Sequence, residues 1–500
     1  MASALTEVRS ASQPRTEIWL RRLFVASLLV AAAAIACHFG LLLWADNSFT
    51  APETEVAGQS MTLARHGILY YDLNRYPYTF CTYTPLFYLL QAGLFKLGLA
   101  AYLAGRLISF CAFLGMVTLA WRLVLLYTQD RDYAWLGVLL CGSSALLLYW
   151  GTAAQVDTLA VFWALAAFYQ YSRYAVLGER TLVWAGAFAL LAFFTKQSML
   201  ACPAAICILL WRRRRQTALA FGMCTGIVAA IAMLSLNAAL GGRFLADTVL
   251  ANLNPFSADK LLQHLQYALL VAGPVLLVAA AGAKTAWRTS AGALLVYLGT
   301  ALAVFVVIAP KVGSDLNYQI EFTSVSILCA CIGLHSLGFL REVFSGSKRA
   351  LTLLQLPLAV FLVVNYRVTF RNALERFAAE QGARVQTEAL RPYISAPGPV
   401  ISADYNALIR VRGHLDVEMF VYKMLVDGGA VDPRPVQRDI AAGLFSAIVL
   451  FQDIQHDTST PPPEVSTLTP AQIQEVRRHY KLTRHISGVY VYQPAARVAN

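Results

Sequence analysis

Long apolar segments, separated by short polar ones, fill the chain up to residue 366. An apolar stretch of about 20 residues is long enough to cross a bilayer as a helix. The pattern therefore predicts about eleven membrane-spanning helices, of which the short ones within 181–211 fit the required length least well. We place these spans at 23–45, 102–127, 133–150, 157–176, 181–195, 198–211, 217–240, 265–284, 290–309, 319–340 and 350–366.

Two parts of the chain depart from this pattern. The apolar segment Pro85–Leu97 is too short to span a bilayer, and it fits a helix that lies at the membrane interface. After residue 366 the charge rises and short alternating runs appear, which predict strands in PVISADYNAL, FSAIVLF and SGVYVYQP. Asp416–Val426 and Pro470–His479 read as helices, the second starting at Thr469. This part is expected to be a small α/β domain.

Composition supports a membrane protein. Of the 500 residues, 58% are hydrophobic and only 14% are charged, whereas soluble proteins carry about 25% charged residues. The expected fold class is an all-α polytopic membrane bundle with interfacial helices and a small C-terminal α/β domain. We expect a cytoplasmic N-terminus over 1–22, a transmembrane domain over 23–366 with an outer loop over 46–101, and an extracytoplasmic domain over 367–500.

The net charge of +12 comes from short basic clusters between the spans, which argues against nucleic-acid binding. Basic residues concentrate in cytoplasmic loops of membrane proteins, so the run 212–215 of four arginines marks the inner side. Counting spans from that run places the longer polar loops together on the outer side. These segments are 46–101, 151–156, 195–197, 241–264, 310–318 and the tail after 366.

The outer loop holds the first candidates for chemistry. Glu53 and Glu55 follow Pro52, and either carboxylate could take the proton of an attacking hydroxyl. The alternative is that they only cap a helix, because an acidic side chain in the first turn favours the helix dipole. Further along, Asp72 and Tyr83 lie among aromatic residues that suit stacking on a sugar, although such tyrosines are usually interfacial belt residues.

Three more polar groups lie at the mouths of spans on the outer side. Asp157 begins a span and could be a helix cap or face a polar cavity. Lys196 and Gln197 form a turn, where the lysine could reach lipid headgroups or bind a phosphate. The last group needs either a polar cavity or local pairing, with Lys311 bonded to Asp315. It comprises Lys311, Asp315, Asn317, Tyr318 and Glu321.

In their order along the chain, these motifs resemble the membrane-embedded GT-C glycosyltransferases, notably the bacterial relatives of the protein O-mannosyltransferase and aminoarabinose transferase group. The resemblance covers roughly residues 18–366. It rests on the acidic position at Glu53 or Glu55 and on a series of short motifs that follow it. They are Gly67 to Tyr71 with Asp72, Tyr83-Thr84-Pro85-Leu86, Gly105-Arg106-Leu107-Ile108-Ser109, Lys196-Gln197 and Gly313 to Glu321.

The resemblance implies a transferase in the cell (inner) membrane that moves a sugar from a polyprenyl-phosphate carrier to a glycan, lipid or protein acceptor outside. Glu53 or Glu55 would be the general base. Arg106 and Lys196 would bind the donor phosphate with help from Lys311, and Asp157, Asn317, Tyr318 and Glu321 would line the cavity. We expect one cavity to join Glu53, Lys196 and Glu321.

Other classes and a metal stay open at this point. The family's acidic pair is often Asp-Glu in tandem, whereas this chain has Glu-Thr-Glu after Pro52, so the identity of the base is undecided. Metal dependence varies within the fold, and the sequence contains no decisive ligand set for a divalent ion. A transporter or lipid flippase would show paired halves or broken spans in matching positions, and a scaffold protein would lack a polar cavity.

Overall fold

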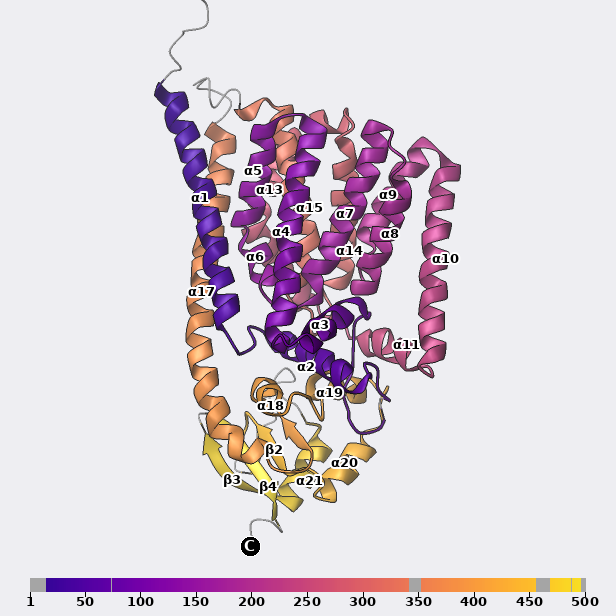
Figure 1. Ribbon diagram of the computed structural model, residues 1–500, viewed down its shortest axis with the longest axis vertical. Coiled ribbons are helices and arrows are strands. Elements are labelled where there is room, and N and C mark those ends of the chain that lie inside the picture. Colours follow the sequence, from indigo (N-terminus) through magenta and orange to yellow (C-terminus); the bar gives the residue numbers. More distant parts are fainter. Residues whose placement is uncertain (1–14, 73, 341–351, 456–467, 487, 496–500) are drawn as a thin grey trace, which may run out of the picture.

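The computed structural model describes residues 15–72, 74–340, 352–455, 468–486 and 488–495. A bundle of apolar helices forms one end of the molecule, and shorter helices and a small sheet form the other (Figure 1). The bundle includes α1 (Arg15–Trp44), α4 (Ala101–Thr128), α7 (Val156–Leu177), α8 (Leu182–Thr195), α9 (Ala201–Arg213), α10 (Arg215–Ala239), α14 (Gly292–Ile308), α15 (Ile320–Ser336) and α17 (Thr352–Ile394).

Two expected single spans are broken into bent pairs. Residues 133–150 become α5 (Arg131–Ser143) and α6 (Ala145–Gly151), which meet at 65°. The span expected over 265–284 is replaced by α12 (Ala258–Val271) and α13 (Gly273–Trp287), which meet at 72°. Pro274 at the start of α13 explains the second break, because proline cannot continue the hydrogen-bond ladder of a preceding helix. The hydropathy pattern predicts neither break, since it gives one continuous span over each of these two regions.

The described helices confirm a polytopic membrane bundle. Three of them are long and apolar enough to cross a membrane, and the number rises to five if each bent pair is one span. The remaining bundle helices coincide with the shorter apolar segments of the sequence. Because the remaining helices do not combine the length and the apolar character that this criterion requires, the count of about eleven spans stays a prediction.

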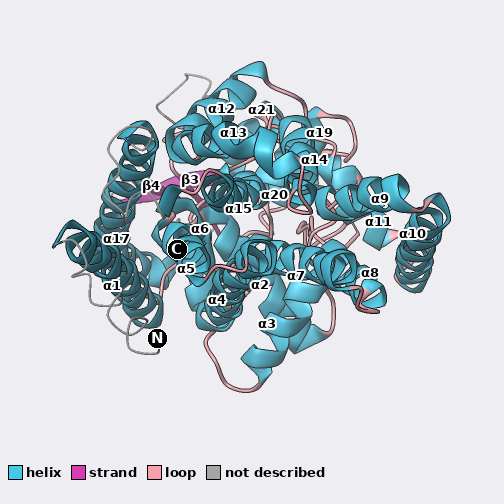
Figure 2. Cartoon of the chain, turned by 90° about the horizontal axis from the view of Figure 1, so that it is seen from above, coloured by secondary structure: helices cyan, strands magenta, loops and turns pink. Residues whose placement is uncertain are grey.

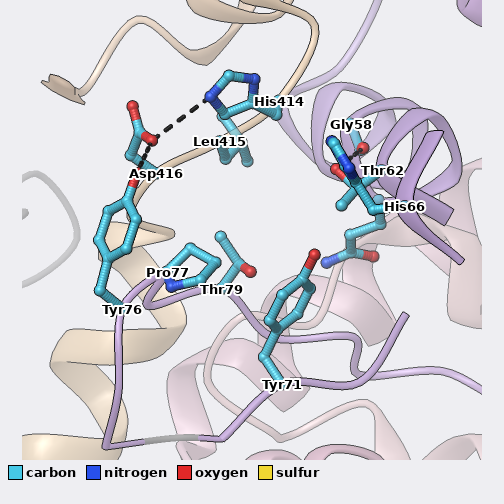
Figure 3. Close-up of a pocket in the computed structure, with 11 residues that line it drawn as sticks. Gly58, Thr62, His66, Tyr71, Tyr76, Pro77, Thr79, His414, Leu415 and Asp416 are labelled. Carbon is cyan, nitrogen blue, oxygen red and sulfur yellow. Dashed lines mark hydrogen bonds and ion pairs between the residues drawn. The ribbon is translucent and has the colours of Figure 1, made fainter. Parts of the chain in front are cut away.

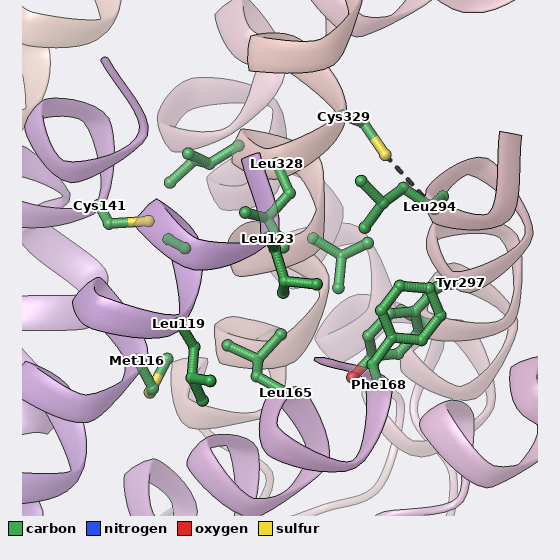
Figure 4. Close-up of a cluster of buried hydrophobic side chains, with 14 of the residues drawn as sticks. Met116, Leu119, Leu123, Cys141, Leu165, Phe168, Leu294, Tyr297, Leu328 and Cys329 are labelled. Carbon is green, nitrogen blue, oxygen red and sulfur yellow. Dashed lines mark hydrogen bonds between the residues drawn. The ribbon is translucent and has the colours of Figure 1, made fainter. Parts of the chain in front are cut away.

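The interior of the bundle is packed from side chains of several helices. Leu123 of α4, Leu165 of α7 and Leu328 of α15 lie in one cluster, with Tyr297 of α14 beside Phe168 (Figure 4). The rim is different: α10 lies at one edge of the bundle, opposite α1 and α17 (Figure 2). Apolar side chains along α10 are exposed, as expected for a helix that faces lipid.

The outer loop folds into two helices at one end of the bundle. α2 (Ala51–His66) begins with Thr50, whose side chain accepts from the Glu53 N–H, and ends at Gly67 with φ of 70°. α3 (Leu86–Lys96) has 11 residues and packs against α2 and α4. The predicted helix over Pro85–Leu97 is confirmed. The short α11 (Arg243–Thr248), η1 (Leu250–Asn252) and η2 (Leu316–Gln319) complete this layer.

The C-terminal part confirms the expected α/β domain. Its sheet has the order β1-β2-β4-β3, with β1 and β2 parallel and the other pairs antiparallel. The strands are β1 (Val400–Ser402), β2 (Ala447–Leu450), β3 (Tyr480–Ile486) and β4 (Val489–Pro494). The helices are α18 (Tyr405–Arg412), α19 (Met419–Asp427), α20 (Arg434–Ala441) and α21 (Pro470–His479).

Two details of this domain differ from the sequence pattern. Only the start of PVISADYNAL is a strand, because Asp404 accepts from the Ala407 N–H and begins α18. The expected domain boundary after residue 366 falls inside α17, which runs without interruption to Ile394. The domain therefore continues directly from the last helix of the bundle.

The C-terminal domain is joined to the outer loop by backbone hydrogen bonds. The N–H of Tyr78 donates to the Asp416 carbonyl at 3.0 Å, and the N–H of Glu418 donates to the Tyr78 carbonyl at 2.8 Å. α2 also packs closely on α18, since a Cβ at Gly58 would lie 2.6 Å from Cδ1 of Ile409. The loop and the domain together form a single layer over the end of the bundle.

Candidate active site

Glu53 is buried in the first turn of α2 and is fully engaged. Its Oε1 accepts from Nε of Arg106 at 2.8 Å and from the Ala154 N–H at 2.7 Å, and its Oε2 accepts from the Phe49 N–H. Arg106 is equally buried and also donates to two backbone carbonyls. Glu53 and Arg106 therefore form a structural ion pair between α2 and α4, which corrects their expected roles as base and phosphate ligand.

Lys196 is also neutralised inside the protein. Its Nζ forms an ion pair with Asp157 at 2.5 Å, and both side chains are buried. Asp157 accepts a second bond from Nδ2 of Asn317 at 2.9 Å. The ammonium lies 3.9 Å from the ring centroid of Tyr318 and 5.5 Å from that of Tyr83. Because its charge is compensated, Lys196 is not the free phosphate-binding cation that we expected.

Three other expected binding residues are bonded away from any shared cavity. Nε2 of Gln197 donates to the carbonyls of Thr82 and Thr248, both at 2.8 Å. Glu321 is buried and accepts from the Tyr297 hydroxyl at 2.7 Å. Asp72 lies on an exposed turn beside Arg75, at 3.5 Å. None of the three cavities described below, all lined by described residues, joins Glu53, Lys196 and Glu321.

Two adjoining cavities lie instead between the outer loop, the bundle and the C-terminal domain. The larger has a volume of about 1000 Å³ and is bounded by α2, α12, the loop before α15 and the C-terminal domain. The smaller, of about 90 Å³, reaches toward Tyr83, Lys311 and Tyr318. Glu55 lines both cavities and is the only ionisable residue that they share. We call this pair of spaces the Glu55 cavity.

Of the residues proposed from the sequence, the Glu55 cavity brings together five and leaves out the rest. Glu55, Tyr83, Lys311, Asp315 and Tyr318 line it. The residues that are bonded elsewhere or sit behind the wall are Glu53, Asp72, Arg106, Asp157, Lys196, Gln197, Asn317 and Glu321.

A paired loop positions Lys311. The N–H of Ser257 donates to the Pro310 carbonyl at 2.7 Å, and the N–H of Val312 donates to the Pro255 carbonyl at 2.9 Å. This pairing holds Lys311 so that its Nζ donates to the carbonyl of Asn252 at 3.1 Å. Burial, and then the nearby Lys196, lower the pKa of Lys311. Within the described residues Lys311 has no acidic partner, so it can bind an anion.

The surroundings of Glu55 favour a proton acceptor. Burial, and then the neighbouring carboxylate of Glu418, raise the pKa of Glu55 well above its usual value. Glu418 caps α19 by accepting from the Val421 N–H at 2.8 Å, and it accepts from the Tyr405 hydroxyl at 3.2 Å. In the described part of the chain no group donates to the Glu55 carboxylate. Such a carboxylate can accept a proton from a substrate hydroxyl.

The side chains do not suggest a metal ion. In the described ranges, no three His, Cys, Asp or Glu side chains gather closely enough to hold one.

Sequence reasoning missed several residues of the cavity wall. Asn252 and Asn254 lie in a loop assigned to the outer side, where two amides so close together are a signal for a polar site. His264 and Tyr405 also line the larger space, and Glu418 stands behind it. The sequence carries no signal for Glu418, because its position depends on how the C-terminal domain docks.

Comparison with known proteins supports the fold and leaves the sequence family open. No protein-family model matches the chain, and no curated protein matches it by sequence. In structure, the chain is similar to ArnT from Cupriavidus metallidurans bound to undecaprenyl phosphate, with a TM-score of 0.63 at 13% identity over 95% of this chain and 97% of that one. The same enzyme in the apo state gives 0.63 at 13% over 97% and 100%.

The chain has the GT-C fold. The match to ArnT spans the transmembrane bundle, the outer-loop helices and the C-terminal domain, since it covers nearly the whole of both chains. An archaeal oligosaccharyltransferase from Archaeoglobus fulgidus is a weaker match, with a TM-score of 0.47 at 13% identity over 87% of this chain and 69% of that one. The likeness to ArnT fixes the architecture in which the Glu55 cavity lies.

Proposed function

We propose that the protein is a membrane glycosyltransferase that moves a sugar from a polyprenyl-phosphate carrier to a hydroxyl of an envelope acceptor. The observation that carries the proposal is the Glu55 cavity. It places a carboxylate of raised pKa and the cation of Lys311 in adjoining spaces within a GT-C fold. The acceptor is a glycan, lipid or protein, and the donor sugar is a hexose or pentose.

In the proposed reaction, Glu55 takes the proton of the acceptor hydroxyl as its oxygen attacks C1 of the donor sugar. The bond between C1 and the phosphate oxygen breaks, and the electron pair leaves with the phosphate. Lys311 lies at the wall of the smaller space, where its ammonium stabilises the charge that develops on that phosphate. Tyr83 and Tyr318 line the same space and offer aromatic faces to the sugar.

The larger space suits the entry of a lipid donor. α12 forms one wall of it, and Leu270 of this helix both lines the cavity and is 54% exposed. The neighbouring Leu269 is 67% exposed, so an apolar surface leads to the cavity from the side of the bundle. A polyprenyl chain can lie along this surface in lipid while its phosphate reaches Lys311. The crystal structure of ArnT with undecaprenyl phosphate supports this class of donor for the shared fold.

We also propose that the cavity faces the extracytoplasmic side of the cell (inner) membrane. The run 212–215 of four arginines spans the junction of α9 and α10, at the end of the bundle away from the C-terminal domain (Figure 1). Positively charged loops stay in the cytoplasm, which leaves α2, α3 and the C-terminal domain outside. The polyprenyl carrier would then deliver its sugar on the outer surface.

The alternative of a transporter or flippase gains one observation, the two bent helix pairs. In transporters, broken helices in matching halves direct their ends toward one substrate site. Here α12 lines the Glu55 cavity, but no residue of 131–151 does. The two breaks therefore do not frame one site, and the enzyme remains the better proposal.

The test is sugar transfer by purified full-length protein in lipid nanodiscs, with radiolabelled polyprenyl-phosphate sugars and an envelope extract as acceptor. Glu55→Gln should reduce the rate by about 100-fold or more, as expected for loss of a general base. Asp72→Asn is the matched control, because it removes an exposed carboxylate of the same loop, and it should leave the rate unchanged. Transfer by Glu55→Gln within tenfold of the unmodified protein would rule out the assigned base.

A further inference from the structure

A third cavity adjoins the Glu55 cavity at the side chain of Gln59, a residue of α2. It has a volume of about 150 Å³, and Gln59 lines both it and the smaller part of the Glu55 cavity. Its wall combines α2, residues 71, 76, 77 and 79, and residues 414–416 of the C-terminal domain. Figure 3 shows His66, Tyr71, Tyr76 and His414 around a common open space. We call it the Tyr71 cavity.

We propose that the Tyr71 cavity binds a sugar unit of the acceptor next to the unit that is modified. This inference rests on the proposed function, and it narrows the acceptor to a glycan or glycolipid. A protein acceptor, whose reactive hydroxyl is followed by peptide, would not need such a site.

The size of the Tyr71 cavity fits a single small polar ring. Its volume of about 150 Å³ corresponds to the room that about five water molecules take up in the liquid. A space of this size accommodates one pyranose ring. No lysine or arginine lines it, so a phosphate group has no strong cationic partner there.

The lining has free hydrogen-bonding groups of both kinds. Within the described residues, no partner binds the Tyr71 hydroxyl, the Thr79 hydroxyl or the His66 ring. Burial raises the pKa of Tyr71 to about 12, so the phenol stays neutral and both donates and accepts. The hydroxyl groups of a sugar need such mixed partners, and the ring of Tyr71 adds an apolar face.

The charged group of the cavity is already satisfied. Asp416 is buried and accepts from the Tyr76 hydroxyl and, at 2.8 Å, from the Val400 N–H, with His414 at 3.4 Å. Burial by itself raises the pKa of Asp416, but the hydrogen bonds from His414, Tyr76 and Val400 outweigh it and lower the pKa. Asp416 thus stays ionised and compensated, and the cavity favours a neutral ligand over an ion.

The position of the cavity matches an acceptor that extends from Glu55. Glu55, Gln59, Thr62 and His66 follow one another at intervals of three or four residues, so they lie on one face of α2. A helix rises 1.5 Å per residue, which places Thr62 about 10 Å from Glu55 along the axis. An acceptor whose hydroxyl reaches Glu55 would place its next sugar in the Tyr71 cavity by passing the Gln59 side chain, which donates to the Phe80 carbonyl.

The test measures sugar binding without turnover, by saturation-transfer NMR on the full-length protein in nanodiscs. The probes are the methyl glycosides of glucose, galactose, mannose and N-acetylglucosamine. At least one should bind, and His66→Ala and Tyr71→Phe should each weaken its affinity about fivefold, the equivalent of one hydrogen bond. His479→Ala is the matched control, because it removes an exposed histidine of α21 outside the cavity, and it should bind as the unmodified protein does.

Failure of this inference is distinct from failure of the proposed function. Glu55→Gln should keep the sugar signal although it loses transfer. If none of the four glycosides binds, or if binding survives both His66→Ala and Tyr71→Phe, the acceptor subsite is wrong while transfer by Glu55 can still stand. If the unmodified protein binds a glycoside in the Tyr71 cavity but Glu55→Gln transfers sugar normally, the assignment of Glu55 as the base is wrong. The assignment of the sugar site then still stands.

Discussion

Glu53 and Glu55 are two residues apart on α2 and have opposite surroundings. Glu53 points into the bundle, where Arg106 and two backbone N–H groups occupy its oxygens. Glu55 points toward the C-terminal domain and lines both parts of the reaction cavity. The same helix therefore uses one carboxylate to hold its position and the other for chemistry. The alternative interpretation, that a glutamate in this segment only caps the start of the helix, applies to Glu53.

The pH dependence of transfer should report on Glu55. The carboxylate must be ionised to accept a proton, and its pKa lies above the usual value of 4.5. The rate of transfer should therefore fall as the pH drops through this raised pKa. At pH values above that pKa the rate should reach its full value. Glu418→Gln removes the neighbouring negative charge, so the midpoint of the kcat/KM profile should move to lower pH, by about 0.5–1 unit.

A Glu418→Gln variant whose profile keeps its midpoint, or moves it to higher pH, would show that the two carboxylates do not interact. Tyr405→Phe is a useful companion, because it removes one hydrogen bond to Glu418 and keeps the carboxylate itself. Its profile should stay close to that of the unmodified protein.

The ion pair of Glu53 and Arg106 should matter for stability. Arg106→Met leaves a buried carboxylate without its partner, which costs about 3–5 kcal/mol. The double variant Glu53→Gln with Arg106→Met has no unpaired charge and should be more stable than Arg106→Met alone. Thermal unfolding of the detergent-solubilised protein measures both. Equal unfolding temperatures for the single and the double variant would contradict the pairing.

At the scale of elements, hydropathy located the helices of the bundle well. The interfacial helix and the helix Pro470–His479 also followed from the sequence, the latter because Thr469 and Pro470 give a clear start. The break before α13 had a signal in Gly273-Pro274 that length alone concealed. The run of α17 beyond residue 366 was missed because its outer part is polar rather than apolar, with polar residues even at buried positions.

The partners of the polar residues were much less predictable. Arg106 lies 53 residues from Glu53, and Lys196 lies 39 residues from Asp157. Each pair forms only when helices pack, so local sequence offers both members as free candidates for ligand binding. Glu55, Lys311 and Tyr318 line the Glu55 cavity, although their sequence surroundings look much like those of the paired residues, and their roles as base, phosphate ligand and cavity lining stay predictions.

The close crossing of α13 and α15 makes a prediction at this scale. A Cβ at Gly282 would lie 2.2 Å from Cα of Gly333, which is backbone and cannot move aside cheaply. Gly282→Ala should therefore lower the unfolding temperature, by the equivalent of about 1–3 kcal/mol. Gly299→Ala is the matched control, because a Cβ there meets nothing within 4 Å. If both variants unfold at the same temperature, the helices do not cross as closely as described.

At the scale of the whole molecule, the outer loop and the C-terminal domain act as one cover over the bundle. The backbone bonds of Tyr78 with residues 416–418 fix the domain against the loop. The reaction cavity lies at the junction, with walls from α2, α12 and the C-terminal domain. An intact cavity therefore requires both the membrane bundle and the domain that follows it.

The orientation of this cover can be tested by labelling. Asp72 lies on the exposed turn of the outer loop, and Arg214 lies between α9 and α10 at the far end of the bundle. In intact spheroplasts, Asp72→Cys should react with a membrane-impermeant maleimide, whereas Arg214→Cys should react only after permeabilisation. The reverse pattern would place the Glu55 cavity on the cytoplasmic side.

The most direct test of the central claim is mass spectrometry of envelope glycans and lipids from cells with and without the gene. The account predicts that deletion removes the sugar from one envelope component. Expression of the unmodified protein should restore that sugar, whereas Glu55→Gln at equal abundance in the membrane should not. An unchanged envelope after deletion, or full restoration by Glu55→Gln, would contradict the assignment of a glycosyltransferase that uses Glu55.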